Sequence, residues 1–226
     1  MRAILVVCSL VAAGCAVTPP GSRPAPRIEP LPTVEPPSTI IDMVGWRDDH
    51  PLILASAYWD PGGSSRRLQA AVLDRVTGDR KEVVVALVQG DRLAGVVPLA
   101  SILVGGRQKR TVGAVLTELP LDATRRALRV DVRTFEAGES QLFAVKTTFL
   151  SMDGDTPVRM LERLVESGDR LRDRRADISV KDVDGDGVPE LIFEEHESGM
   201  AQSRTLVYRR GPDGRYVTKE RSIFDE

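Results

Sequence analysis

The sequence predicts an all-β fold, an antiparallel β-sandwich or a barrel-like domain. Short runs in which every second residue is apolar recur along the chain, and residues that favour turns separate them. Such alternation suits strands that bury one face, and close turns join neighbouring strands in antiparallel pairs. Apolar residues at helical spacing occur in one stretch, so the prediction includes one short helix from Val158 to about Glu166.

Three hairpins and one further strand are expected in chain order. In the first hairpin Thr77 and Gly78 form the turn, and the other two turn at the Gly-containing segments 136–140 and 211–214. The strands expected to pair are 68–73 with 83–88, 128–132 with 142–150, and 205–209 with 216–219. The further strand is expected at 112–116.

Composition divides the chain into a signal segment, residues 1–14, a proline-rich linker, residues 15–38, and a single globular domain, residues 39–226. Proline lacks a backbone N–H, so we expect the linker to be an extended spacer without helix or sheet, about 60 Å long at most. The chain is 42% hydrophobic, which is enough to bury one core. Its net charge of −2 and the lack of a basic patch in its sequence argue against a nucleic-acid partner.

An acidic loop, residues 182–190, crowds four carboxylates into nine residues. At separations of about 5 Å and an effective dielectric constant of about 20, neighbouring carboxylates repel by roughly 3 kcal/mol per pair. A divalent cation relieves this repulsion, because the acids place oxygens at alternating loop positions and a backbone carbonyl turns inward between them. The expected metal ligands are Asp182, Asp184, Asp186, the carbonyl of Val188, and Glu190.

Calcium is the cation that this loop favours. Ca²⁺ accepts roughly six to eight hard oxygen ligands in a flexible geometry, whereas Mg²⁺ requires a strict octahedron and gives up its water reluctantly. Gly185 and Gly187 allow the backbone to curl around the ion. The alternative is a hairpin turn without an ion, since Asp and Gly are common turn formers.

The flanks of the loop indicate its class. An EF-hand loop also opens with Asp-x-Asp-x-Asp-Gly, but it needs Glu at position 12, where this chain has Phe193, and it needs helical flanks. Here the flanking triplets 178–180 and 191–193 are typical of strands. With Glu190 at position 9, residues 177–194 resemble the calcium hairpin of FG-GAP and VCBS repeats, which implies one structural calcium ion.

Repeats of that family normally occur in arrays. The nearest second copy in this chain, residues 151–159, has Ser151 in place of the first acid and Arg159 in place of the last. We therefore expect this copy to bind no metal, and we do not expect a whole propeller.

The amino terminus has the pattern of a secretory signal, with a charged start, an apolar core at residues 3–13 and small residues before Cys15. The core is too short to span a bilayer as a helix. Ala12-Ala13-Gly14-Cys15 resembles a bacterial lipobox, with Ala12 where Leu is preferred. The resemblance implies lipidation of Cys15 and, with Ala16 following it, an anchor in the outer membrane on its periplasmic or surface face. An ordinary signal peptide cut elsewhere and a buried amino-terminal strand are the alternatives.

The chain offers few residues for catalysis. His50 and His196 are its two histidines, so a histidine-based zinc site or triad has little to draw on. Residues 194–197, Glu-Glu-His-Glu, alternate across a strand, and we predict a charged, exposed sheet edge there. We expect a non-enzymatic module that binds another envelope component, a protein or a glycan. The alternative is an envelope hydrolase or enzyme accessory that uses carboxylates between Glu190 and Glu197.

Overall fold

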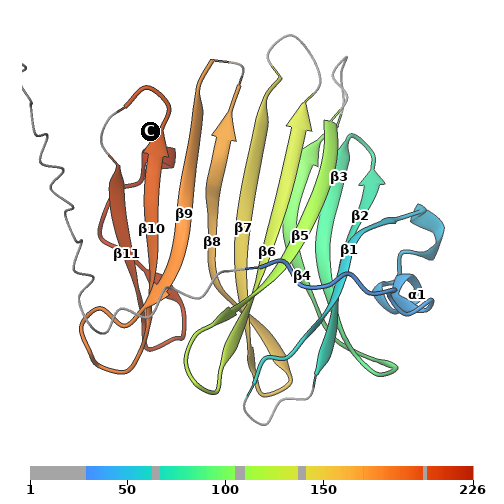
Figure 1. Cartoon of the computed structure of the whole chain (residues 1–226). Coiled ribbons are helices and arrows are strands. Elements are labelled where there is room, and N and C mark those ends of the chain that lie inside the picture. Colours follow the sequence, from blue (N-terminus) through green and yellow to red (C-terminus); the bar gives the residue numbers. More distant parts are fainter. Residues whose placement is uncertain are drawn as a thin grey trace, which may run out of the picture.

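Two antiparallel sheets that do not close into a barrel make up the structure, which confirms the all-β, sandwich-like prediction (Figure 1). The structure is a computed structural model and describes residues 29–62, 67–104, 110–136, 141–169, 171–200 and 203–225. The smaller sheet contains, in spatial order, β1 (Leu52–Trp59), β2 (Leu68–Thr77), β3 (Arg80–Gln89) and β4 (Arg92–Leu103). The larger sheet contains, in spatial order, β12 (Tyr216–Val217), β11 (Arg204–Arg210), β10 (Glu190–Glu197), β9 (Asp173–Lys181), β8 (Thr156–Gly168), β7 (Phe143–Asp153), β6 (Arg126–Glu136) and β5 (Arg110–Pro120).

The predicted hairpins are present. Strands β2 and β3 pair through Thr77 and Arg80, and Gly78 takes the positive φ of 62° that the turn requires. Strands β6 and β7 pair as expected, and the predicted strand at 112–116 lies within β5. The last hairpin also forms, but β12 is shorter than predicted.

The predicted helix at 158–166 is wrong, because these residues belong to strand β8 and pair with β7. The register of that pairing skips Met160 and Val165, so each of them forms a β-bulge. Both side chains point into the core and are only 2% and 4% exposed, respectively. Each bulge shifts the two-residue alternation by one position, and two bulges close together produce a spacing that resembles a helical face.

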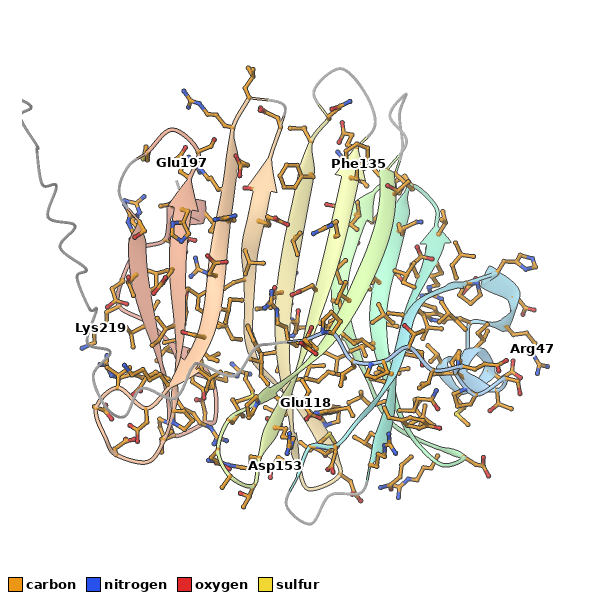
Figure 2. The ribbon with its side chains drawn as sticks, viewed as in Figure 1. Arg47, Glu118, Phe135, Asp153, Glu197 and Lys219 are labelled. Atoms are coloured by element: carbon orange, nitrogen blue, oxygen red, sulfur yellow. The ribbon has the colours of Figure 1, made fainter. Side chains whose placement is uncertain are left out.

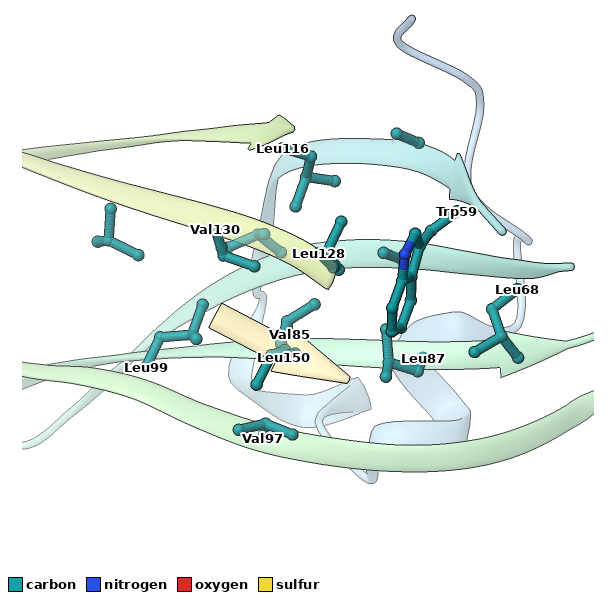
Figure 3. Close-up of a cluster of buried hydrophobic side chains, with 14 of the residues drawn as sticks. Trp59, Leu68, Val85, Leu87, Val97, Leu99, Leu116, Leu128, Val130 and Leu150 are labelled. Carbon is teal, nitrogen blue, oxygen red and sulfur yellow. The ribbon is translucent and has the colours of Figure 1, made fainter. Parts of the chain in front are cut away.

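The first apolar cluster fills the space between the smaller sheet and strands β5 to β7. Figure 3 shows Trp59, which is fully buried, among side chains from both sheets. Each fully buried aliphatic side chain stabilises the fold by about 1.5 to 3 kcal/mol. The buried members are Ala57, Trp59, Leu68, Ala70, Val72, Val83, Val85, Leu87, Val97, Leu99, Leu116, Leu128, Val130, Val132 and Leu150.

Helix α1 (Ile40–Val44) packs on the outer face of the smaller sheet, and short 3-10 turns lie at Arg47–Asp49 and Ile223–Asp225. Ala71 and Ala86 belong to the cluster beneath α1, where small side chains leave room for the helix. This coverage explains why residues 83–88 form a continuous apolar run, since both faces of β3 are buried there. Within the described ranges, no helix has the length and apolar character needed to cross a membrane.

The second apolar cluster lies on the other face of the larger sheet and supports the hairpin of β9 and β10. Phe149 and Leu150 are adjacent on β7, and Leu150 faces the first cluster while Phe149 faces the second. The ring of Phe193 on β10 lies 6.2 Å from that of Phe149 and 4.9 Å from that of Tyr208 on β11. Strands β7, β10 and β11 are therefore joined by aromatic contacts.

The two open sides of the sandwich are closed differently. At one side β4 approaches β8, and a Cβ atom added to Gly95 would lie only 2.6 Å from Cγ of Pro157. The ammonium of Lys146 donates to the carbonyl of Leu99 at 2.9 Å, and Arg159 donates to the carbonyl of Pro98. Cationic side chains therefore occupy backbone acceptors of this edge strand.

At the other side, residues 30–35 cross from β5 to β1 and form a segment that we call the N-terminal strap (Figure 1, blue trace). Leu31 N–H donates to the Leu116 carbonyl at 2.8 Å, and Val34 N–H donates to the Ser56 carbonyl at 2.9 Å. The side chain of Leu31 packs against the first cluster. The expectation that the linker has no sheet structure is thus wrong for the strap. Its prolines have no backbone N–H, but Leu31 and Val34 do, and these two residues donate the hydrogen bonds to β5 and β1.

Removing the strap should lower stability. A fragment that begins at residue 39 should melt about 4 to 8 °C below one that begins at residue 29, because it loses roughly 2 kcal/mol of apolar burial and hydrogen bonding. Thermal unfolding followed by circular dichroism measures this difference. Equal melting temperatures would show that the strap does not stabilise the sandwich.

The buried phenol of Tyr208 should make the fold sensitive to alkali. Burial raises its pKa from 10.0 to about 12, while nearby Arg163, whose guanidinium donates to the hydroxyl, opposes that rise. The folded state therefore holds this proton more tightly, and its stability should fall as the pH rises from about 10 to about 12, by up to roughly 2 to 3 kcal/mol. Urea unfolding across this range should show a smaller loss for Tyr208→Phe, whereas Tyr58→Phe, at an exposed position, should behave like the wild type.

Candidate metal centre

The acidic loop connects β9 to β10 at one end of the larger sheet. Lys181 pairs with Glu190, so the hairpin predicted between residues 177 and 194 is confirmed, with residues 182–189 as its connection. Leu191 and Phe193 follow directly and are buried in the second apolar cluster. The core therefore fixes the point at which the loop ends.

Asp182 organises the backbone of the loop. Its Oδ1 accepts from Gly185 N–H at 2.7 Å, and its Oδ2 accepts from Gly187 N–H at 3.0 Å. Gly185 and Gly187 have φ values of 78° and 83°, which few residues other than glycine adopt. The sequence pattern of alternating Asp and Gly thus produces a tight turn around one carboxylate.

Three of the four predicted carboxylate ligands lie together. Asp182, Asp184 and Glu190 each place one oxygen so that these oxygens are all within 4.8 Å of one another, and we call these three residues the carboxylate cluster. Asp186 does not belong to the cluster, and its Oδ1 accepts from Val188 N–H at 2.7 Å. The Val188 carbonyl as a ligand stays a prediction.

Glu190 is the buried member of the cluster, with a side chain only 4% exposed. Its Oε2 accepts from Val183 N–H at 2.7 Å. No described residue donates a hydrogen bond to its Oε1, and the nearest cationic atom is Arg209 Nε at 4.0 Å. A carboxylate oxygen can accept more than one ligand, so this oxygen has capacity for a further one.

Arg209 was not anticipated from the sequence. It lies on β11, where Tyr208 pairs with Leu191, and the antiparallel register places the next residue, Arg209, beside Glu190. Its Nε lies 3.7 Å from Asp184 Oδ2. The sequence predicts both strands, but the register that brings Arg209 to the cluster depends on their pairing.

The cluster offers oxygen donors that could hold a hard divalent cation. Its donors are hard carboxylate oxygens, two from exposed residues and one from a buried residue, so solvent has access to complete a coordination shell. Three negative charges face the single positive charge of Arg209 at distances longer than a hydrogen bond. A divalent cation offsets this excess charge better than a distant guanidinium does.

The carboxyl end of the loop is tied to β12. The hydroxyl of Tyr216 donates to the Pro189 carbonyl at 2.9 Å. Burial raises the pKa of Tyr216, and the charges of Arg210 and Arg125 partly oppose this rise. Since the phenol stays protonated at neutral pH, this contact fixes the residue that precedes Glu190.

The second acidic segment has a different shape. Asp153 pairs with Thr156, so β7 and β8 are joined by a tight two-residue turn with Gly154 at a φ of 58°. This turn lies at the same end of the molecule as the acidic loop (Figure 2, Asp153). Its geometry leaves no nine-residue loop comparable to residues 182–190.

The prediction that residues 194–197 form an exposed sheet edge is wrong, because β10 lies between β9 and β11. Glu195 is 1% exposed, and its two oxygens accept from the Ser222 hydroxyl and from Ile223 N–H. Glu197, at the end of β10 away from the acidic loop, pairs with Arg174 at 3.3 Å (Figure 2). Glu195 thus holds the C-terminal segment directly, and Glu197 pairs with Arg174, which itself donates to the Ile223 carbonyl. These contacts give no support to the hydrolase alternative.

Fold and site together define a β-sandwich protein with a carboxylate cluster on one hairpin. In comparisons with known proteins, no family model, no curated protein and no solved structure matches this chain. Any function of the protein must therefore be inferred from its own residues.

Proposed function

We propose that this protein is a non-enzymatic, membrane-anchored envelope lipoprotein whose acidic hairpin holds a structural calcium ion. The observation that carries the metal proposal is the cluster of Asp182, Asp184 and Glu190, whose oxygens lie within 4.8 Å of one another on a hairpin fixed by the core. The further ligands would be water and the Val188 carbonyl, and Asp186 would require a change in its side-chain position.

The calcium ion would stabilise the hairpin and would not act as a sensor. Strands β9 and β10 pair over their whole length, and β10 continues into the second apolar cluster. A sensor needs an element that opens on binding, whereas a cation here closes a turn between strands that are already paired. An affinity in the range of about 10⁻⁴ to 10⁻³ M, typical of extracellular modules, would suffice.

The membrane proposal depends on Cys15, which lies outside the described residues. Acyl chains on its thiol and new amino group would contribute about 0.8 kcal/mol per buried CH₂, and several chains anchor stably where one does not. The domain would then face the periplasm or the cell surface at the outer membrane. There it would bind another envelope protein or a glycan through its sheet faces or loops.

Asp184→Ala should distinguish a loop that binds a structural calcium ion from a hairpin turn without an ion. In saturating calcium the variant should melt about 5 to 10 °C below the wild type, because it loses a binding contribution of roughly 2 to 3 kcal/mol. In chelator the variant should melt no lower than the wild type, since Asp184 is exposed, its carboxylate accepts only a 3.3 Å hydrogen bond from Asp186 N–H, and its loss removes one of the repelling charges.

The matched control for that experiment is Asp155→Ala, which removes an exposed acid from the β7–β8 turn and should change neither melting curve. Differential scanning calorimetry gives the four comparisons. An equal loss for Asp184→Ala with and without calcium would contradict the metal proposal.

Cys15→Ser should release the protein from the membrane. The variant cannot form the thioether to lipid, so fractionation of cells should move it from the membrane pellet to the soluble fraction. The wild type should need detergent for extraction. A variant that still needs detergent would count against lipidation at Cys15.

A further inference from the structure

Arg209 lies near two acidic groups. Its Nε lies 3.7 Å from Asp184 Oδ2 and 4.0 Å from Glu190 Oε1. The second group is Glu220, which accepts from the N–H of Val207, two residues before Arg209 on β11; hydrogen bonds from Thr218 and Val207 lower its pKa, and the charge of Arg209 lowers it further. The side chain of Arg209 is 58% exposed, so it has room to change its rotamer without displacing the core.

Contacts with the carboxylate cluster are too long for hydrogen bonds, so they hold Arg209 there by charge alone. A divalent cation among the same oxygens would repel the guanidinium at this distance. Glu220 is available as the second partner, because its Oε2 is already oriented by Val207 N–H at 2.9 Å and by the Thr218 hydroxyl.

We propose that Arg209 is a built-in counterion of the carboxylate cluster, which competes with calcium for the site and turns toward Glu220 when the cation binds. This inference rests on the proposed calcium site. In the metal-free protein Arg209 limits the repulsion among the three carboxylates, and in the bound protein it strengthens the contact between β11 and the segment that carries Glu220. Arg209 therefore sets the affinity of the site and links it to the C-terminal segment.

The coupling has a structural route. Glu220 accepts from Val207 N–H, which is a backbone donor of β11 near the short strand β12. An ion pair between Arg209 and Glu220 would add a second contact between the same two segments. Cation binding should thus make the C-terminal segment more firmly held, although it lies outside the acidic loop.

Isothermal titration of the full chain in detergent with calcium chloride tests the proposal. Arg209→Met removes the competing charge without adding an oxygen ligand, and it should lower the Kd about fivefold, which corresponds to the roughly 1 kcal/mol that an exposed ion pair contributes at most. The matched control is Arg92→Met, which makes the same change in net charge at an exposed position on β4, in the other sheet. Its Kd should stay within about twofold of the wild type, because solvent screens a more distant charge.

Glu220→Gln tests the second half of the proposal. Glutamine still accepts from Val207 N–H but carries no charge, so this variant should bind calcium about twofold to threefold more weakly than the wild type. In the Arg209→Met background the same substitution should have no effect on Kd, because the pair that it would disrupt is already gone.

The outcomes distinguish a failure of the calcium site from a failure of the proposed role of Arg209. If the wild type and all variants give no heat of binding, the calcium site itself fails and the role of Arg209 fails with it. If the wild type binds calcium but Arg209→Met has an unchanged Kd, or Arg92→Met tightens binding equally, the site stands and Arg209 is not its counterion. Melting of each variant in chelator shows that all of them are folded.

Discussion

Apolar packing forces like charges together at the β9–β10 hairpin, and the rest of this region is arranged around that constraint. Leu191 and Phe193 are fixed in the second apolar cluster, so Glu190 cannot move away from Asp182 and Asp184. The repulsion must be offset locally. Backbone N–H groups of the loop donate hydrogen bonds to the carboxylates, and the guanidinium of Arg209 supplies positive charge. In our proposal a calcium ion supplies the remainder. Tyr216 holds the carboxyl end of the loop in place.

Much of the fold could be predicted from local patterns. The alternation and the turn signal at Thr77-Gly78 are sufficient to predict the β2–β3 hairpin, because both signals lie within one short segment, although the turn itself is one residue later, at Gly78-Asp79. The same holds for the acidic hairpin, where alternating Asp and Gly indicate both the turn and its donors. Three of the four predicted carboxylates meet, since Asp182 and Asp184 share a loop whose end is fixed by the strand that begins at Glu190.

Features that depend on pairing between distant segments were not predictable in this way. Because of the bulges at Met160 and Val165, the apolar residues of β8 have the spacing of a helical face. The two residues without a partner become evident only from the pairing of β8 with β7. The interior place of β10, and hence the burial of Glu195, depends on β11 lying beside it. Arg209 reaches Glu190 by the same register. Each of these errors or omissions arises because a single strand contains no information about its neighbour's alignment.

The N-terminal strap changes how the domain would be connected to a membrane. Upstream of Pro30, a polyproline linker from Cys15 would reach only roughly 45 Å at about 3 Å per residue. Tension along such a linker would enter the sandwich at Leu31 and Val34, where hydrogen bonds join it to Leu116 on β5 and Ser56 on β1. Mechanical load would therefore meet the contact with β5 first and the contact with β1 second, so both sheets would have to release the strap before it came away.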